Sequence, residues 1–271
     1  MVIRWVLLGA AALFAAYCLL VLVSSWLVDT SREYDKNSRY YRWLLYSATA
    51  LALFFGRIRL HVSGMEKLPA QGRFLLVSNH RSKFDPITSW YVLRRYDVAF
   101  ISKQENFSVP MFGRIIRRCC FLPIDRENPR RALTTVEHAA ALIRADEVSI
   151  GVYPEGTRSQ SGQLLPFHCG VFKIAQEAGV PIVVMAVQGT EKIHRNFPWR
   201  RTDVFIDILD TIPAEYTAAQ RTCDLGDEIR GELEKHLGQG GHEREAVHSL
   251  SSAFRQRAGR AACQKRKGAP A

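Results

Sequence analysis

The chain has 271 residues, of which 47% are hydrophobic and 23% are charged, an ordinary composition for one packed domain with short appendages. Its formal net charge of +11 indicates an anionic partner, either nucleic acid or anionic lipid. No zinc-finger spacing, RNP-like aromatic pattern or basic zipper accompanies this charge, so we expect no nucleic-acid partner.

An uncharged apolar run covers Trp5 to Val28. At ~1.5 Å per residue it predicts a helix of ~36 Å, enough to cross a hydrocarbon core of ~30 Å. Trp5 and Trp26 lie near its two ends, where indole rings favour the membrane interface. A cleaved signal peptide is the competing interpretation, but the run is longer than such peptides need. We therefore predict a retained membrane anchor.

Basic residues follow this run and, by the positive-inside tendency, predict that the globular part lies on the cytoplasmic side. They are Arg32, Lys36, Arg39 and Arg42. A second apolar helix is predicted over about residues 41–55, which is short for a membrane span. An interfacial or re-entrant helix and a buried helix of the globular domain are both open alternatives for it. Residues 1–56 are assigned to the membrane anchor.

From residue 57 onward, apolar runs alternate with amphipathic stretches. This alternation predicts a layered α/β domain over residues 57–237, with a mixed sheet flanked by helices. The predicted strands are Arg57–Val62, Phe74–Ser78, Val98–Ser102, Val148–Tyr153, Ile182–Val187 and Val204–Leu209. The predicted helices are Pro86–Arg95, Pro110–Arg117, Pro129–Arg144, Gly170–Ala178 and Ala218–Leu237.

Residues 238–271 are predicted to form a basic, flexible C-terminal tail. The stretch Arg255–Ala271 has basic residues and no acidic ones, so either a solvated tail or a contact with an anionic leaflet fits it. The six cysteines form no Cys-x-x-Cys pair. This pattern favours a reduced compartment and mostly inert thiols, and it predicts no metal site.

A histidine and an aspartate follow the predicted strand Phe74–Ser78. His80 precedes Asp85 by five residues, and Asp85 and Pro86 mark the start of a predicted helix. An imidazole takes up a proton near neutral pH, and a carboxylate can fix its tautomer. His80 and Asp85 are therefore candidates for a general base and its partner. The alternative for Asp85 is an N-cap of the helix without any chemical role.

A second motif, Pro154–Ser159, lies where the strand Val148–Tyr153 is predicted to run into a glycine turn. Arg158, just beyond Gly156, suits bidentate binding of phosphate or carboxylate. A surface ion pair between Arg158 and Glu155 is the alternative. The chain has no Gly-x-Ser-x-Gly elbow, Walker loop or His-Glu-x-x-His motif, so a hydrolase with an acyl-enzyme is unsupported.

With these motifs the chain resembles the glycerolipid acyltransferase family, specifically the 1-acyl-sn-glycerol-3-phosphate acyltransferases. The family motif Asn-His-x-x-x-x-Asp matches Asn79–Asp85. A lysine-led segment that closes on an arginine matches Lys103 to Arg126. Two further motifs, Pro-Glu-Gly-Thr-Arg-Ser and Val-Pro-Ile-Val, match Pro154–Ser159 and Val180–Val183. Their occurrence together and in order makes the resemblance specific.

The resemblance implies that the enzyme moves a fatty acyl group from acyl-CoA or acyl-carrier protein to a lysophospholipid. The implied acceptor is the sn-2 hydroxyl of 1-acyl-sn-glycerol-3-phosphate in a phospholipid membrane, with no metal or bound cofactor. His80 would be the base and Asp85 its orienting partner. The acceptor site would include Glu155, Gly156, Thr157 and Arg158, with Lys103 and Arg126 completing a phosphate pocket. Ion pairs of Lys103 with Glu105, and of Arg126 with Asp125 or Glu127, are the structural alternatives.

Two positions depart from the family pattern. Cys120 stands where the family often has a glycine, and Phe167–Gly170 reads Phe-His-Cys-Gly in place of Phe-Lys-Lys-Gly. Because the second change removes positive charge, the acceptor stays open: another lysophospholipid, glycerol 3-phosphate or an amino-acid-based lipid also fits. A non-catalytic phospholipid-binding protein of the membrane is the alternative from a different class.

Overall fold

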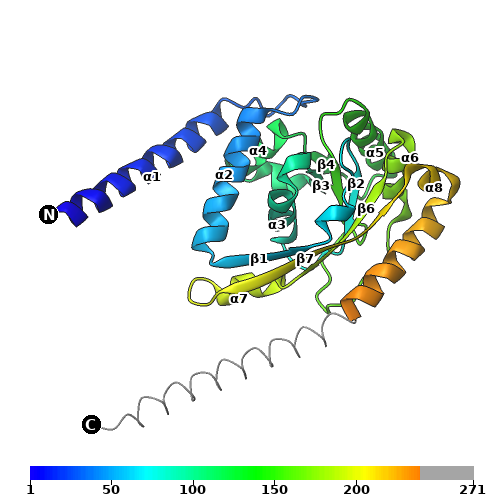
Figure 1. The fold of residues 1–271 in the computed structure, drawn as a ribbon. Helices are drawn as coiled ribbons and strands as arrows, with labels where there is room; N and C mark the ends of the chain where they lie inside the picture. Colours follow the sequence, from blue (N-terminus) through cyan, green and yellow to red (C-terminus); the bar gives the residue numbers. More distant parts are fainter. Residues whose placement is uncertain (239–271) are drawn as a thin grey trace, which may run out of the picture.

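A seven-stranded mixed sheet forms the centre of the molecule in the computed structural model, which describes residues 1–238 (Figure 1). The strand order is β1-β7-β6-β2-β5-β3-β4. The strands are β1 Ile58–Ser63, β2 Leu75–Ser78, β3 Ala99–Lys103, β4 Leu122–Ile124, β5 Ile150–Val152, β6 Ile182–Gln188 and β7 Thr202–Ile212. The predicted α/β class with a mixed sheet is confirmed. Apart from residue 238, the predicted C-terminal tail lies outside the described residues.

The strands fall into two sets by direction. Five strands run parallel to one another, namely β6, β2, β5, β3 and β4. β7 runs antiparallel to β6 and pairs in parallel with β1. The central strands β2 and β6 are almost entirely buried, as expected for a sheet covered on both faces. The carboxyl ends of five strands therefore lie along one edge of the sheet.

All six predicted strands are present, and β4 is a strand that the sequence did not reveal. It has three residues, one of them Pro123, and it pairs only with β3 through the register Ile101↔Leu122. Such a short run has too few residues to show a period of two, and proline is tolerated because β4 is an edge strand.

Helices connect the strands and cover the sheet. The α-helices after β2 are α3 Asp85–Val92, α4 Phe112–Arg118, α5 Pro129–Arg144, α6 Lys173–Ala178, α7 Ile193–Asn196, α8 Ala214–Ala219 and a helix over 222–238. Short 3-10 helices cover Met65–Lys67, Arg94–Tyr96, Gln104–Ser108, Cys169–Phe172 and Thr190–Lys192. In Figure 1, α2, α3 and α4 lie on one side of the sheet, and α5, α6, α8 and the 222–238 helix lie on the other.

Two helix predictions need correction. The helix predicted over Gly170–Ala178 is a 3-10 turn, Cys169–Phe172, followed by the short helix α6. The helix predicted over Ala218–Leu237 is interrupted at residues 220–221, which separate α8 from the 222–238 helix. The interruption lets α8 pack on α6, while Leu225, Ile229 and Leu233 of the longer helix are fully buried.

Two apolar helices precede the sheet. α1 Val2–Trp26 is, among residues 1–238, the one helix long and apolar enough to cross a membrane, and almost all of its side chains are exposed. α2 Arg39–Phe55 packs one face against the domain and exposes aromatic side chains on the other. Buried Arg42 on α2 donates to the carbonyls of Val98 and Cys119, each at 2.8 Å. α2 is therefore joined to the globular domain by its polar as well as its apolar contacts.

Candidate active site

The chemically interesting side chains follow the ends of the parallel strands. His80 follows β2, Pro154–Ser159 follows β5, Lys103 ends β3, Arg126 follows β4 and Thr190 follows β6. Because the carboxyl ends of parallel strands meet at one edge, the strand order brings these five segments to the same side of the molecule. This edge is the common location of binding and catalytic groups in open α/β sheets.

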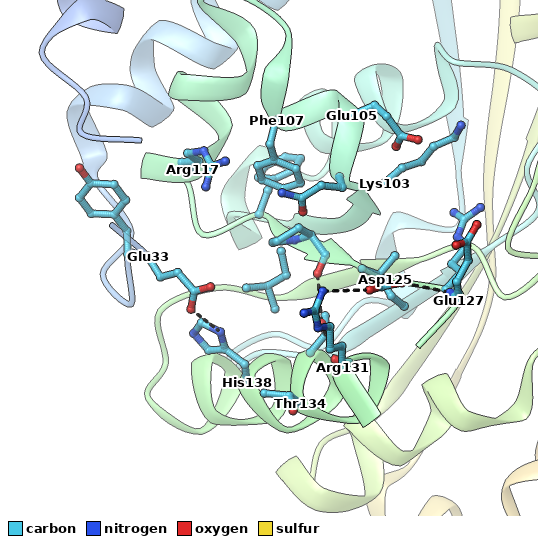
Figure 2. A pocket seen from close by; sticks show the side chains of 18 of the residues that line it. Glu33, Lys103, Glu105, Phe107, Arg117, Asp125, Glu127, Arg131, Thr134 and His138 are labelled. Carbon is cyan, nitrogen blue, oxygen red and sulfur yellow. Dashed lines mark hydrogen bonds and ion pairs between the residues drawn. The ribbon is translucent and has the colours of Figure 1, made fainter. Parts of the chain in front are cut away.

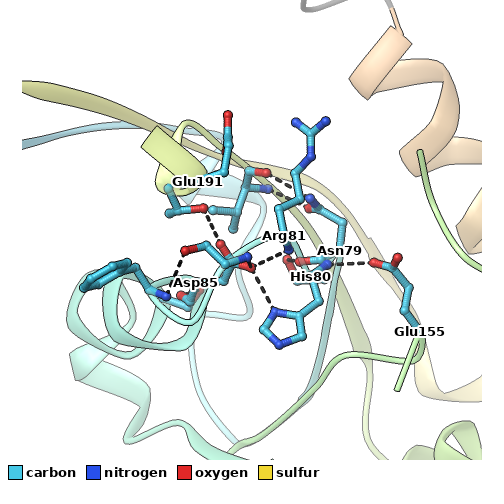
Figure 3. A network of polar contacts seen from close by, with 12 residues as sticks. Asn79, His80, Arg81, Asp85, Glu155 and Glu191 are labelled. Atoms are coloured by element: carbon cyan, nitrogen blue, oxygen red, sulfur yellow. Dashed lines mark hydrogen bonds and ion pairs between the residues drawn. The ribbon is translucent and has the colours of Figure 1, made fainter. Parts of the chain in front are cut away.

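His80 and Asp85 form the centre of a polar network at this edge (Figure 3). The Nδ1 of His80 lies 2.9 Å from the Oδ2 of Asp85. The same oxygen accepts the backbone N–H groups of Arg81 and Ser82 at 2.7 Å each, and the Thr190 hydroxyl donates to Oδ1. Since Asp85 is buried and accepts all these bonds, the Nδ1 of His80 is the donor. The Nε2 of His80 is left with its lone pair, the state that a general base requires.

The N-cap interpretation of Asp85 is wrong. α3 begins at Asp85 itself, and the residue at the cap position is Phe84. The carboxylate reaches backward to the N–H groups of Arg81 and Ser82 in the loop before the helix. Asp85 therefore organises the loop that carries His80, and Pro86 occupies the first turn, where proline is favoured.

The Pro154–Ser159 segment holds the backbone of His80 from both sides. Glu155 accepts the His80 N–H at 2.7 Å through Oε1, and the Ser159 N–H donates to the His80 carbonyl at 2.8 Å. The second Glu155 oxygen accepts the Leu165 N–H at 3.0 Å. Burial raises the pKa of Glu155 above its ordinary value, although the two N–H donors act in the opposite direction. Glu155 thus positions the histidine loop through the His80 N–H group and makes no ion pair with Arg158.

Two aromatic rings fix the plane of the imidazole. Tyr153 stacks on His80 with ring centroids 4.2 Å apart and an interplanar angle of 15°. Phe100 in turn stacks on Tyr153, with ring centroids 5.4 Å apart and an interplanar angle of 11°. Burial raises the pKa of the Tyr153 hydroxyl, so the ring stays neutral near physiological pH. Tyr153 and Thr190 were missed by the sequence analysis, because only the strand order brings Thr190 to Asp85.

All three predicted substrate-binding cations are exposed and unpaired. Within residues 1–238, no ion pair or side-chain hydrogen bond holds Lys103, Arg126 or Arg158. The pairing alternatives for these three residues, including Lys103 with Glu105, are therefore wrong. Asp125 instead accepts from Arg131 of α5 at 3.4 Å.

Two cavities adjoin these cations. The larger has a volume of about 740 Å³, and Lys103, Arg117 and Arg131 lie along its wall (Figure 2). Arg126 lines it as well. A smaller, mainly apolar cavity of about 350 Å³ lies between β5 and α5, and Tyr153 is one of the residues that line it. Ile124 and Arg126 line both cavities, so the two cavities are neighbours. Arg158 lines neither of them.

Cys120 and His168 are the residues at the two departures from the family pattern. Cys120 has a φ of 56°, a conformation that glycine favours, and it is buried with a pKa raised to about 12 by desolvation. Gly156 has a φ of 67°, and a Cβ there would lie 2.9 Å from the His168 ring. His168, which stands in place of a family lysine, therefore packs over the glycine turn and lines the apolar cavity.

Comparisons with known proteins show which proteins this chain is similar to. Residues 59–188 match the family model described as Acyltransferase. The chain is 31% identical over 168 residues to the 1-acyl-sn-glycerol-3-phosphate acyltransferase of Haemophilus influenzae, covering 62% of this chain and 69% of that protein. It is also 31% identical over 161 residues to a chloroplastic 1-acyl-sn-glycerol-3-phosphate acyltransferase of Brassica napus, covering 59% of this chain and 46% of the relative.

A solved structure shares the fold. The crystal structure of the 1-acyl-sn-glycerophosphate (LPA) acyltransferase PlsC from Thermotoga maritima superposes with a TM-score of 0.63 at 24% identity. The superposition covers 88% of this chain and 96% of that structure. From the motifs, the family match and the Haemophilus relative together, we conclude that the chain is an enzyme of the glycerolipid acyltransferase family.

Proposed function

We propose that the enzyme acylates the sn-2 hydroxyl of 1-acyl-sn-glycerol-3-phosphate, giving phosphatidic acid, with His80 as the general base. The observation that carries the proposal is the His80–Asp85 pair, whose Nδ1–Oδ2 bond of 2.9 Å leaves Nε2 free to accept a proton. The acyl donor is a thioester, either acyl-CoA or acyl-carrier protein. The names of the relatives support this acceptor.

The chemical step follows from the orientation of the imidazole. Nε2 takes the proton of the acceptor hydroxyl as its oxygen attacks the thioester carbonyl carbon. Asp85 stabilises the imidazolium that forms through its bond to Nδ1. When the tetrahedral intermediate collapses, the C–S bond breaks and the imidazolium returns the proton to the leaving thiolate. The step needs no metal or cofactor, because His80 supplies both proton transfers.

Substrate binding uses the unpaired cations and the apolar cavity. A phosphate monoester carries up to two charges, and Lys103 and Arg126 on one cavity wall are free to bind it. Arg158, together with Gly156 and Thr157, lies at the same edge of the sheet and completes the acceptor site. The mainly apolar cavity would hold the fatty acyl chain, and its lining includes Tyr153, whose ring stacks on His80.

The substrates place the enzyme at a membrane. A lysophospholipid stays in its leaflet, so the active site has to lie at the membrane surface. α1 is apolar over its whole length and supplies the anchor. The basic residues after α1 favour the cytoplasmic side for the catalytic domain.

The decisive assay supplies labelled acyl-CoA or acyl-carrier protein with a panel of lysolipids. We expect phosphatidic acid as the main product, and we expect His80→Ala to lower its rate by about 10²–10⁴-fold. A matched control is His61→Ala. The Nε2 of His61 lies 2.8 Å from the Oδ1 of Asp203 in an exposed pair that is not part of the active-site network. Wild-type transfer in a folded His80→Ala variant would refute the base assignment.

The same assay separates the alternatives. A non-catalytic lipid-binding protein gives no product, and a hydrolase releases free fatty acid without an acceptor. Preferential acylation of another lysophospholipid or of glycerol 3-phosphate would change the acceptor but keep the reaction class. To test the phosphate pocket, 1-monoacylglycerol serves as the acceptor without phosphate. Lys103→Ala, Arg126→Ala and Arg158→Ala should each narrow the preference for the phosphorylated acceptor, and an unchanged preference would contradict that residue's assignment.

A further inference from the structure

A surface loop carries two large aromatic side chains that no part of the described chain covers. This segment, residues 197–201, follows α7 and leads into β7, and we call it the aromatic loop. Trp199 is 84% exposed and Phe197 is 55% exposed. Exposed aromatic rings this close together mark a surface that contacts something apolar.

Positive charge surrounds these rings. Arg195, Arg200 and Arg201 are exposed, and none of them has an ion pair within residues 1–238. The sequence from Lys192 to Thr202 contains no acidic residue. The combination of aromatic rings with unpaired arginines matches the headgroup region of an anionic membrane, where indole rings and guanidinium groups are both favoured.

The sheet places the aromatic loop beside the end of α2. β1 and β7 are parallel neighbours with the register Ile58↔Thr202, so the segments that enter them lie side by side. Arg57, just after α2, donates through its guanidinium to the Trp199 carbonyl at 3.2 Å. In Figure 1, the loop before β7 and the lower end of α2 lie together at the lower left.

The apolar helices continue this surface. Phe54 and Phe55 at the end of α2 are 76% and 57% exposed. Phe55 makes an edge-to-face contact with Phe14 of α1, with ring centroids 6.3 Å apart. The exposed aromatic side chains of α1, the end of α2 and the aromatic loop therefore form neighbouring parts of one side of the molecule.

We propose that the aromatic loop is a second membrane contact, in which Phe197 and Trp199 enter the interface of an anionic leaflet. Arg195, Arg200 and Arg201 bind lipid phosphates around them. The inference rests on the proposed membrane anchoring through α1. With contacts at α1 and at the loop, the domain is held at two separate points, which fixes its orientation relative to the leaflet.

The test measures quenching of Trp199 fluorescence by lipid. The full chain is reconstituted into nanodiscs whose phospholipids carry bromine near the headgroup end of an acyl chain, with phosphatidylglycerol as the anionic component. The emission of Trp199 is the difference between the wild type and Trp199→Phe. We expect brominated lipid to reduce that emission by about half or more, as for an interfacial indole.

Two other tryptophans serve as matched references. Trp90→Phe isolates the emission of Trp90, which is 2% exposed inside the domain and should be unaffected by bromine. Trp5→Phe isolates a residue of α1 and reports on the anchor itself. Quenching of Trp5 without quenching of Trp199 overturns the loop contact alone, including the case in which a protein partner covers the loop. Absence of quenching at both overturns the anchoring as well.

The arginines have a separate readout. The variant Arg195→Gln/Arg200→Gln/Arg201→Gln should lower Trp199 quenching in anionic nanodiscs to the level found in zwitterionic ones. Equal quenching in this variant and the wild type would overturn the binding of lipid phosphates by these side chains. Acyl transfer is measured on the same samples, so a quenched Trp199 in a protein without transferase activity refutes the proposed function and not the loop contact.

Discussion

The carboxylate of Asp85 is buried and accepts hydrogen bonds from the His80 ring, two backbone N–H groups and the Thr190 hydroxyl. A charged group taken out of water needs such a set of donors, because each missing one leaves part of its desolvation cost uncompensated. Thr190 is the only one of these donors that comes from outside the loop Asn79–Asp85. It therefore ties the position of Asp85 to the end of β6.

Thr190→Val is expected to reduce kcat for acyl transfer by about ten- to a hundredfold. It keeps the side-chain shape but removes a hydrogen bond to a charged group, which contributes about 1.5–3 kcal/mol. Thr190→Ser keeps the hydroxyl and should retain most of the activity. Steady-state kinetics with varied acceptor check this, and equal kcat values for the valine and serine variants would contradict the positioning role.

Glu155 makes stability depend on pH in a defined direction. Burial raises its pKa above the ordinary value of 4.5, so the folded protein holds the proton more tightly than the unfolded chain. The stabilisation that protonated Glu155 gives the folded protein is therefore complete below pH 4.5. It is lost as the pH rises through the raised pKa of the folded state. Glu155→Gln removes the ionisation.

Thermal unfolding in detergent at several pH values tests this expectation. As the pH rises from about 4 to about 7, the Tm of the wild type should fall relative to the Tm of Glu155→Gln. A difference that stays constant over that range would show that Glu155 does not titrate as its burial requires.

At the scale of elements, α5 forms part of the wall of both cavities, and the position of α5 depends on its first turn. Asn128 caps α5 by accepting the N–H groups of Arg130 and Arg131 at 3.1 and 3.3 Å. Pro129 occupies the first helical position, where its missing N–H costs nothing. Val136 of this helix lines the apolar cavity, so its position affects the proposed acyl site.

Asn128→Ala is expected to lower the free energy of unfolding by about 1 kcal/mol, since two N–H groups lose their acceptor. Asn128→Asp retains an acceptor oxygen and should be close to the wild type. Chemical denaturation in detergent gives both values. An alanine variant as stable as the wild type would mean that the cap contributes nothing to α5.

At the scale of the whole molecule, the net charge of +11 attracts the enzyme to anionic membranes. Salt should weaken this attraction, because the screening length falls from about 10 Å at 0.1 M to about 3 Å at 1 M. We expect the ratio of transfer rates on anionic and zwitterionic vesicles, with equal acceptor, to approach one as salt increases. A ratio independent of salt would contradict the electrostatic contribution.

Much of the fold was predictable because it depends on local patterns. α5 has the predicted bounds, since a capping asparagine and a first-turn proline mark its start. The buried strands β2 and β6 were recognisable as short apolar runs. β4 was not, because three residues at a sheet edge carry no period. The break between α8 and the 222–238 helix was missed because it is governed by packing on α6.

By itself, the sequence determined the α/β class, the apolar first helix, the pairing of His80 with Asp85 and the family. Only the tertiary structure decided that Asp85 serves its loop, that Glu155 holds the His80 backbone and that Thr190 and Tyr153 complete the site. Residues close in sequence, such as His80 and Asp85, can be recognised as partners from their spacing along the chain. Partners on different strands meet only through the strand order, which the spacing of residues along the chain does not specify.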